Sequence, residues 1–338
     1  MKRILIVYNP HSSRYIDVQK EVISKVQALK GCMIGKYAIK KAPFEENVKN
    51  LTKLFKNGDF VIAAGGDATA AVTANAIMIS KKDVTLAVLP YGNFNDLART
   101  LGTKTLGEVL GTGGRNLSSE DRKLGRTALS VSEEDRFGQD PCQNLYPLEI
   151  WVDGKHWRYA TCYVTMGMTA EAVELFDDPK FRKKMQKGSK SSWRSYIALI
   201  KWYFKFRHSK IFVPEYSLNG KPVKPGVSDY CALSGKSMCR VMKGGYDFLD
   251  PKIFRSHNCR LLSFWGISTL MIKSILFRTP GTETTGDKIV FNNPATVELQ
   301  AEGEYKVSKT PKLLKSKNLA KPSKSLWKGI AKWQIKPH

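Results

Sequence analysis

The sequence predicts two structural parts, an α/β domain with a parallel sheet covered by helices on both faces, and a β-rich second half of antiparallel strands. Up to about Arg99, short apolar strands alternate with segments of helical periodicity, which is typical of parallel sheets. From about Leu145 onward the apolar segments become strand-like and closely spaced. Asp153-Gly154 and Asn219-Gly220 separate pairs of these segments, and such dipeptides favour tight hairpins between antiparallel strands.

Each element of the first half follows from its local pattern. Short apolar, β-branched runs that end at glycine, asparagine or proline predict buried strands, and apolar residues spaced three and four apart predict helices. The predicted strands are 3–8, 33–39, 60–64 and 84–89, and the predicted helices are 16–30, 44–56 and 70–80. Residues 111–144 are polar and rich in glycine and serine, so we expect a loop or linker there.

The second half is predicted from the same kind of local evidence. One helix is expected at 189–207, where aromatic and aliphatic residues recur at helical spacing. The predicted strands are 146–152, 157–166, 211–218, 228–234, 259–265, 288–291 and 295–301.

Composition excludes several classes of protein. Hydrophobic residues make up 42% of the 338 residues, which rules out global disorder. Six scattered cysteines without a C-x-x-C pair argue against a disulfide framework or a zinc site. The first residues lack the long apolar region of a signal peptide. The most apolar stretch, 261–277, is interrupted by Lys273, which disfavours a transmembrane helix. We therefore expect a cytoplasmic protein.

The net charge of +25 is concentrated in two segments. Residues 180–214 contain 11 basic and no acidic residues, and residues 306–338 contain ten lysines and no acidic residue. Elsewhere 34 basic residues face 30 acidic ones, so the rest of the chain is nearly neutral. Such an excess indicates an anionic partner, which could be a nucleic acid, a membrane surface or a nucleotide.

Polar loops follow the first, third and fourth predicted strands, at residues 9–13, 65–67 and 91–96. The carboxyl ends of parallel strands meet at one edge of a sheet, where ligands bind. Glycines allow backbone N–H groups to approach a phosphate, and a helix N-terminus favours negative charge. We therefore predict a phosphate-binding site there, in which Asp67 could bind Mg²⁺ or accept a proton. The alternative is a set of ordinary Asx turns and helix caps.

These loops resemble the motifs of the diacylglycerol kinase catalytic-domain family, which includes bacterial soluble lipid kinases and sphingosine and ceramide kinases. The family motifs N-P-x-S/A, G-G-D-G-T and G-T-x-N-D-x-A-R are similar to Asn9-Pro10-His11-Ser12, Gly65-Gly66-Asp67-Ala68-Thr69 and Gly92-Asn93-Phe94-Asn95-Asp96-Leu97-Ala98-Arg99. Asp247-Phe248-Leu249-Asp250 resembles the family's D-G-x-L-D, and Glu302-Gly303-Glu304 lies where the family has D-G-E. The resemblance covers about 1–305, except 111–144.

The resemblance implies a fold and an activity. The fold would be a doubly wound α/β domain over 1–137, an antiparallel β-sandwich over 138–305 and a basic amphipathic tail over 306–338. The activity would be transfer of the γ-phosphate of ATP to a hydroxyl of a diacylglycerol-like membrane lipid. ATP and Mg²⁺ would be the cofactors.

The resemblance also implies site residues, position by position. The nucleotide would lie against Asn9, Ser12, Gly65, Gly66, Asp67, Ala68, Thr69, Gly92, Asn93 and Asn95. The catalytic carboxylates would be Glu304, Asp96, Asp67 and Glu302, with Glu304 or Asp96 accepting the proton of the lipid hydroxyl. Mg²⁺ would be bound by Asp247 and the carbonyls of Gly244 and Leu249.

Four positions depart from the family pattern. Ala68 and Phe248 replace glycines, Asn93 replaces threonine and Glu302 replaces aspartate. If position 68 requires positive φ or close approach to a phosphate, its Cβ would strain the backbone or crowd the ligand. The departures leave open a catalytically silent, membrane-binding relative as the alternative to an active kinase.

The two basic segments favour a membrane. Lysines recur every four residues from Lys324 to Lys336, with tryptophan, leucine and isoleucine on the other face, which is typical of an interfacial helix. Residues 180–214 mix aromatic and basic residues, a pattern that suits lipid headgroups or single-stranded nucleic acid. Without a nucleic-acid-binding motif, we expect a lipid substrate and peripheral attachment to anionic membranes through both segments. A basic nucleic-acid-binding module, a solvated tail and a homodimer stay open.

Overall fold

The computed structural model describes the first hundred or so residues almost continuously, and the strands of the later part. The described residues are 2–92, 95–103, 105–110, 143–144, 147–152, 155–167, 216–218, 220–222, 229–235, 237–238, 242–243, 254–259, 282–286, 288–291, 297–301, 304–308, 311–316 and 333–334. The chain forms two compact units, each described by itself. The first is Met1–Pro147, Ser234–Lys252 and Lys317–His338, and the second is Leu148–Leu233 and Ile253–Ser316.

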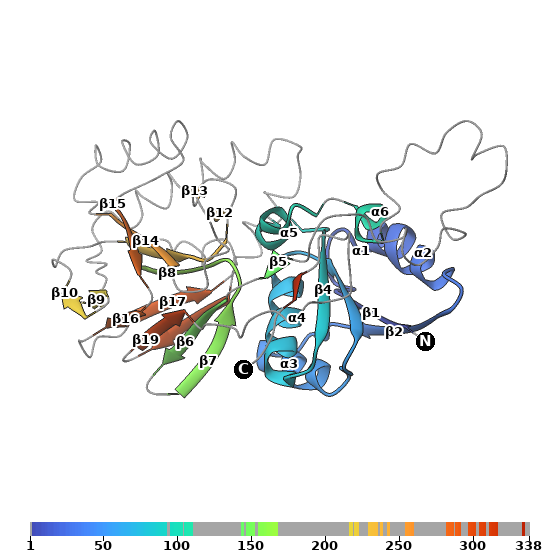
Figure 1. Cartoon of the computed structure of the whole chain (residues 1–338), viewed down its shortest axis with the longest axis horizontal. Coiled ribbons are helices and arrows are strands. Elements are labelled where there is room, and N and C mark those ends of the chain that lie inside the picture. The colour runs from blue at the N-terminus through green and yellow to red at the C-terminus, as the bar shows by residue number, and fades with distance from the viewer. Residues whose placement is uncertain are drawn as a thin grey trace. The chain divides into compact units, whose positions relative to one another are not determined.

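The first unit is built on a parallel sheet (Figure 1). Its parallel strands are β1 (Lys2–Tyr8), β2 (Cys32–Ala38), β3 (Asp59–Gly65) and β4 (Val84–Pro90), in the order β2-β1-β3-β4. All seven residues of β3 are buried and all but Asp59 are apolar, as expected of a strand in a parallel sheet that is covered on both faces. The α/β fold class and the four predicted strands are confirmed.

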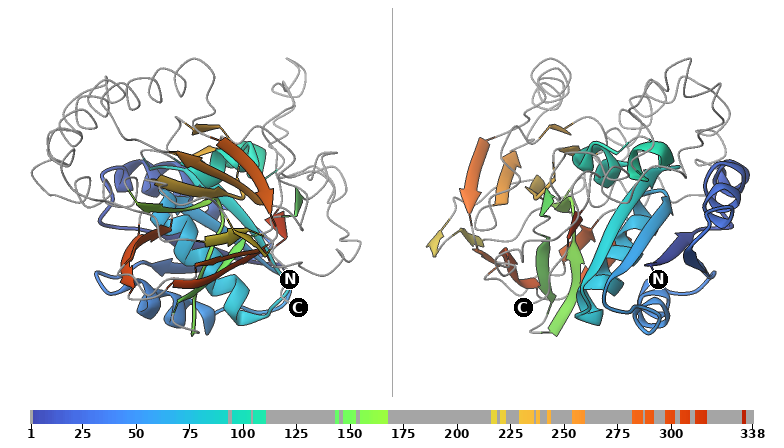
Figure 2. Two further views of the ribbon diagram at one scale, coloured as in Figure 1. Left: turned by 90° about the vertical axis from the view of Figure 1, so that its left-hand side faces the viewer. Right: turned by 45° about the vertical axis from the view of Figure 1, so that its right-hand side comes forward.

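Helices cover both faces of this sheet (Figures 1 and 2). They are α1 (Tyr15–Val18), the π-helix η1 (Gln19–Ile23), α2 (Ser24–Gln27), α3 (Phe44–Thr52), α4 (Asp67–Ser80), α5 (Asp96–Leu101) and α6 (Leu106–Val109). The α1–η1–α2 segment and α6 pack on one face, where Val18, Val22 and Val26 join a core with alternate residues of β1, β3 and β4. α3 and α4 lie on the other face, and the residues of α4 from Thr69 to Met78 are all buried.

The predicted helices differ from the observed ones at their ends. The prediction for 16–30 becomes α1, η1 and α2, with a π-helical segment that hydrophobic periodicity does not reveal. α4 begins at Asp67 rather than at residue 70, because Gly66 takes the extended N-cap conformation and an acidic first-turn residue favours a helix N-terminus. α5 and α6 were not predicted. Each is a short helix of six or four residues, too short for its apolar residues to show a period.

The second unit is antiparallel. Its strands are β6 (Leu148–Val152), β7 (Lys155–Ala160), β8 (Tyr163–Gly167), β9 (Tyr216–Leu218), β10 (Lys221–Pro222), β11 (Asp229–Leu233), β14 (Phe254–Cys259), β15 (Thr282–Gly286), β16 (Lys288–Phe291), β17 (Val297–Ala301), β18 (Glu304–Ser308) and β19 (Pro311–Ser316). They form two sheets, ordered β10-β9-β16-β19-β6-β7 and β15-β14-β11-β8-β17-β18. A separate pair, β12 (Ser237–Met238) and β13 (Met242–Lys243), belongs to the first unit.

Both predicted hairpins are present. β6 pairs with β7 so that Val152 lies opposite Lys155, and β9 pairs with β10 so that Leu218 lies opposite Lys221. Gly220 has φ +78°, a conformation that glycine adopts without a steric cost. The antiparallel character of the second half is therefore confirmed.

Part of the predicted tail is sheet. β18 and β19 pair with other strands of the second unit, so residues 306–308 and 311–316 do not belong to a separate tail. Trp333 and Gln334 form β20, antiparallel to β4 and parallel to β5 (Gln143–Asn144), so the predicted helix does not cover them. β20 satisfies backbone groups that β4 would otherwise expose at the sheet edge. The number of lysines in a segment indicates that its side chains favour solvent, but it does not show whether its backbone pairs with another strand.

Two further predictions concern the domain boundary and a membrane-spanning helix. The predicted boundary between residues 137 and 138 falls before the observed division at Pro147 and Leu148, and 234–252 returns to the first unit. Because later segments of the chain return to the first unit, one domain boundary in the sequence cannot divide the two units. Among the residues that the structure describes, no helix combines the length and the apolarity needed to cross a bilayer.

Candidate functional site

Two of the predicted loops touch at the carboxyl edge of the parallel sheet. Gly66 follows β3 and Gly92 follows β4. A Cβ added at Gly66 would lie 3.1 Å from the Cα of Gly92, and one added at Gly92 would come still closer to the Cα of Gly66. At Gly92 the two backbones approach more closely than a side chain allows, so this position requires glycine; at Gly66 an added Cβ would force the neighbouring backbone to shift by a few tenths of an ångström. The contact joins the two glycine motifs into one surface.

Gly65 is required for a different reason. A Cβ there would lie 2.6 Å from Cβ and 2.9 Å from Cγ2 of Thr69, a buried residue in the first turns of α4. The glycine lets α4 start directly over the end of β3. The first N–H groups of a helix lack intrahelical partners, and the N-cap residue Gly66 has no side chain to bond them. This helix N-terminus is suited to an anion.

Asp67 links the two loops. Its Oδ1 accepts a hydrogen bond from the backbone N–H of Asp96 at 2.6 Å, and its Oδ2 accepts one from the N–H of Asn95 at 2.9 Å. Asp67 therefore caps α5 from another helix, since Asn95, the N-cap residue of α5, makes no capping bond with its own side chain. Burial raises the pKa of Asp67, while these two N–H groups and the Arg99 guanidinium oppose the rise.

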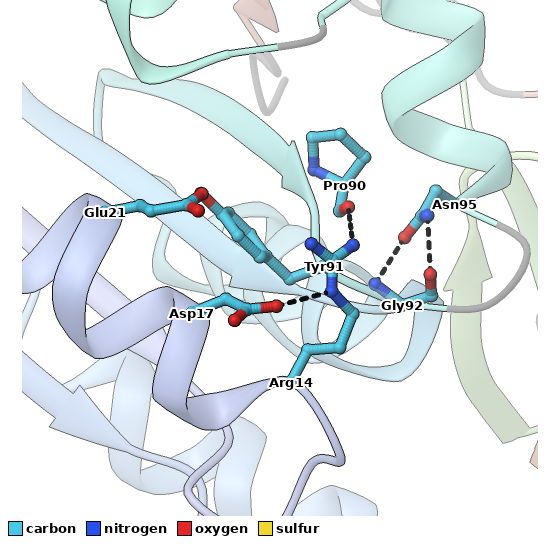
Figure 3. Close-up of polar contacts among 7 residues, drawn as sticks. All are labelled: Arg14, Asp17, Glu21, Pro90, Tyr91, Gly92 and Asn95. Carbon is cyan, nitrogen blue, oxygen red and sulfur yellow. Dashed lines mark hydrogen bonds and ion pairs between the residues drawn. The ribbon is translucent and has the colours of Figure 1, made fainter. Parts of the chain in front are cut away.

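Asn95 closes the loop after β4 on itself (Figure 3). The Gly92 N–H donates to Asn95 Oδ1 at 2.7 Å, and Asn95 Nδ2 donates to the Gly92 carbonyl at 2.7 Å. Asn95 has φ +54°, a left-handed conformation that asparagine tolerates better than most residues. The side chain is buried and both ends of its amide are bonded, so Asn95 shapes the loop.

Asp96 is buried, with 1% of its surface exposed, and forms an ion pair with Arg99 one turn later in α5. A carboxylate must come within hydrogen-bond reach of a hydroxyl to accept its proton. The geometry therefore assigns Asp96 a structural contact, and its catalytic role stays a prediction.

The loop after β1 supplies a further polar group. The His11 N–H donates to Asn9 Oδ1 at 2.9 Å, and the Ser12 N–H donates to the Asn9 carbonyl at 3.2 Å, which forms a tight turn. The Ser12 hydroxyl is buried and has no hydrogen-bond partner among the described residues. A buried hydroxyl without a partner is costly in an apolar site, and a bound anion would satisfy it.

Ala68 does not carry the backbone strain considered from the sequence. It is the second residue of α4 and is exposed, and the only non-glycine residues with positive φ in the described part of the chain are Lys81 and Asn95. Glycine is therefore not needed there for conformation. Crowding of a phosphate by the Ala68 methyl group stays a prediction.

The structure does not test the remaining predicted residues. Asn93, Glu302, Asp247, Gly244 and Leu249 lie outside the described residues, and Glu304 is described only as the first residue of strand β18. The roles predicted for them stay predictions. Within the described ranges, no group of three or more His, Cys, Asp or Glu side chains could hold a metal ion.

Some contact residues of this site were missed by sequence reasoning. Arg14, Glu21, Tyr91 and Arg99 all contact the loops or each other. Tyr91 lies directly before the third motif and Arg99 lies within it, so their places in the sequence could have marked them as site residues. Arg14 and Glu21 carry no local signal, because they meet Tyr91 only when the helices pack on the sheet.

Residues 3–117 match the family model described as diacylglycerol kinase catalytic domain. The resemblance to that family is confirmed over these residues. The match includes all three loops of the site. A curated diacylglycerol kinase of Bacillus subtilis (strain 168) is 35% identical over 104 residues, which are 30% of this chain and 34% of that protein. The chain therefore aligns with about a third of the length of that relative.

Solved structures show that the likeness of fold extends further than this match. A diacylglycerol kinase structure from Bacillus anthracis str. Sterne superimposes with a TM-score of 0.59 at 15% identity, covering 93% of each chain. A second structure from that organism has a TM-score of 0.60 at 14% identity and covers 93% of this chain and 94% of its own. At these identities the likeness concerns the fold.

Proposed function

We propose that this protein is an ATP- and Mg²⁺-dependent lipid kinase that transfers the γ-phosphate to a hydroxyl of a diacylglycerol-like membrane lipid. The observation that carries the proposal is the bridge from Asp67 to the backbone of Asn95 and Asp96. With the contact between Gly66 and Gly92, it joins two of the family's motif loops into one surface at the carboxyl edge of the sheet. The family match over these loops supports the same reaction class.

The described residues would act by binding and orienting the nucleotide. The N-terminus of α4 and the hydroxyl of Ser12 offer hydrogen-bond donors to phosphate oxygens. Phosphoryl transfer depends mainly on such positioning and on charge stabilisation. Mg²⁺ would arrive with ATP and neutralise phosphate charge. The residues proposed to hold an ion, Asp247 with the carbonyls of Gly244 and Leu249, and the proposed proton acceptor Glu304 belong to the same hypothesis.

Peripheral membrane binding completes the proposal. The lipid substrate would be reached through the basic residues of 180–214 and of the chain beyond residue 316. Each lysine close to an anionic bilayer contributes about 1 kcal/mol. Residues 304–308 and 311–316 form strands of the second unit, so we assign the C-terminal contribution to residues 317–338.

The test is phosphorylation of a lipid panel with labelled ATP. Vesicles that contain diacylglycerol, an isoprenol, a sphingoid base or phosphatidylglycerol are incubated with the full chain, with and without Mg²⁺. We expect one lipid class to take up label, and Asp67→Asn to abolish the uptake, since an amide cannot accept both backbone hydrogen bonds. Asp83→Asn, an exposed residue before β4, is the matched control and should retain activity. No label in any lipid would contradict the kinase.

A catalytically silent relative is the second candidate. The burial and pairing of Asp96 favour it, since they remove one of the two predicted proton acceptors from reach. Calorimetry with Mg-ATP separates the candidates, because the kinase should bind nucleotide with micromolar affinity and the silent relative weakly or not at all. Binding to anionic vesicles should persist in both cases, whereas a nucleic-acid-binding module would prefer RNA or DNA with a steep salt dependence.

A further inference from the structure

A cluster of contacts surrounds the residue that precedes Gly92 (Figure 3). The Tyr91 hydroxyl donates to Glu21 Oε2 at 2.7 Å. The guanidinium carbon of Arg14 lies 5.1 Å from the centroid of the Tyr91 ring, within the range of a cation–π contact. Tyr91 is 8% exposed and belongs to the core beneath the α1–η1–α2 helices.

The backbone of Tyr91 is tied to the site. Its N–H donates to the carbonyl of Gly65 at 3.0 Å, at the end of the neighbouring strand. The next residue, Gly92, touches Gly66 and holds the Asn95 amide. Any rotation of the chain at Tyr91 would therefore move Gly92 against Gly66 and disturb both hydrogen bonds to Asn95.

Arg14 connects the first loop with the fourth strand. Its Nη1 donates to the carbonyl of Pro90 at 3.4 Å, and its Nε forms an ion pair with Asp17 at 2.9 Å. The Arg14 and Asp17 side chains are both nearly half exposed, so this ion pair by itself contributes little. The ion pair matters more for geometry than for energy, because Asp17 orients the Arg14 guanidinium toward Tyr91 and Pro90.

Glu21 lies in the middle of the π-helix η1. The Gln19 carbonyl accepts both the backbone N–H of Ser24 and, at 2.9 Å, the Ser24 hydroxyl, so the wide turn is satisfied internally. π-helical turns change the register of a helix and occur often at functional sites. Here the turn keeps Val22 and Ile23 buried while the Glu21 carboxylate reaches the Tyr91 hydroxyl.

We propose that Tyr91, together with Arg14 and Glu21, is a positioning residue that holds Gly92 and Asn95 in the arrangement that receives the nucleotide phosphates. The part that concerns nucleotide rests on the proposed function. Tyr91 itself would not touch the substrate. Burial and the Glu21 carboxylate raise the pKa of Tyr91, so its hydroxyl remains a donor throughout the physiological pH range.

Tyr91→Phe removes the hydroxyl and keeps the ring. We expect the Kd for Mg-ATP, measured by calorimetry, to rise about threefold to tenfold, the effect of one hydrogen bond. In the lipid assay, KM for ATP should rise while kcat changes less. Glu21→Gln keeps an acceptor for the hydroxyl and should bind ATP like the wild type, whereas Glu21→Ala should match Tyr91→Phe. The double variant Tyr91→Phe/Glu21→Ala should be no worse than either single variant.

Tyr37→Phe is the matched control. It deletes the hydroxyl of another buried tyrosine of the same unit, one that contacts Asn47 at 3.3 Å. It should lower stability without changing the Kd for Mg-ATP. If Tyr91→Phe also leaves that Kd unchanged, the proposal is overturned.

Hydrogen exchange separates this proposal from the kinase proposal. The amides of Gly92 and Asn95 are bonded to side chains of the site, and their exchange should accelerate about tenfold in Tyr91→Phe and not in Tyr37→Phe. If the wild-type protein binds no nucleotide and exchange still accelerates in Tyr91→Phe but not in Tyr37→Phe, the kinase proposal is rejected and the positioning role is supported. Equal exchange at both amides in Tyr91→Phe and the wild type would reject the positioning role.

Discussion

Replacing Gly92 with alanine tests whether the contact between two loops builds the candidate site. The added Cβ would lie within 3.0 Å of the Gly66 Cα, 2.9 Å from Asn95 Oδ1 and 3.2 Å from the Gly66 N. Cβ contacts at 3.4 Å and beyond are ordinary, and two of these neighbours are backbone atoms, which cannot change rotamer. The loops after β3 and β4 must therefore move apart until these backbone contacts are relieved.

This separation should cost both stability and binding. Overpacking at a well-packed position lowers the free energy of unfolding by about 1–3 kcal/mol. It also stretches the two 2.7 Å hydrogen bonds between Gly92 and Asn95. Loss of one such bond corresponds to about a tenfold weaker affinity, so we expect the Kd for Mg-ATP to rise about tenfold or more. Urea unfolding measures the first effect and calorimetry the second.

Gly58→Ala is the control for this substitution. Gly58 precedes β3 at the opposite edge of the sheet, has φ +81° and has no atom within 4 Å of an added Cβ. The alanine would be strained only by its backbone conformation, at about 1 kcal/mol, and Mg-ATP affinity should stay at the wild-type value. A Gly92→Ala protein with wild-type stability and affinity would refute the argument from the glycine contact.

Further predictions concern stability, pH, phosphate crowding and the membrane. Asn47→Ala should lower the free energy of unfolding by about 1–3 kcal/mol, measured in urea, since its buried amide bonds Lys40 N–H and three carbonyls. Burial raises the pKa of Asp67 above 3.8, so the stability of wild type relative to Asp67→Asn should fall as pH rises above that value; a rise would contradict it. Ala68→Gly should tighten Mg-ATP binding in calorimetry if its exposed methyl group crowds the phosphate; unchanged affinity would dismiss crowding. Deleting 317–338 should weaken sedimentation with anionic vesicles, whereas unchanged sedimentation would reject that attachment.

Much of the first unit was predictable because its signals are local. β1, β3 and β4 are continuous apolar runs that end in polar or glycine-containing loops, and burial on both faces of a parallel sheet selects such runs. The two hairpins were predictable because two-residue turns require particular dipeptides. The motif loops were predictable as a group, since parallel strands place their carboxyl ends at one edge.

The sequence alone therefore determined β1 to β4, the fold class and the edge where the polar loops gather, because burial periodicity and turn chemistry act over a few residues. Only the tertiary structure decided how those loops are held together. Asp67 caps a helix that begins 29 residues later, and Tyr91 bonds a glutamate 70 residues earlier. Gly66 needs Gly92 as its neighbour, and β20 returns from the end of the chain to pair with β4. Such contacts depend on packing between distant segments, and no local pattern of residue types encodes them.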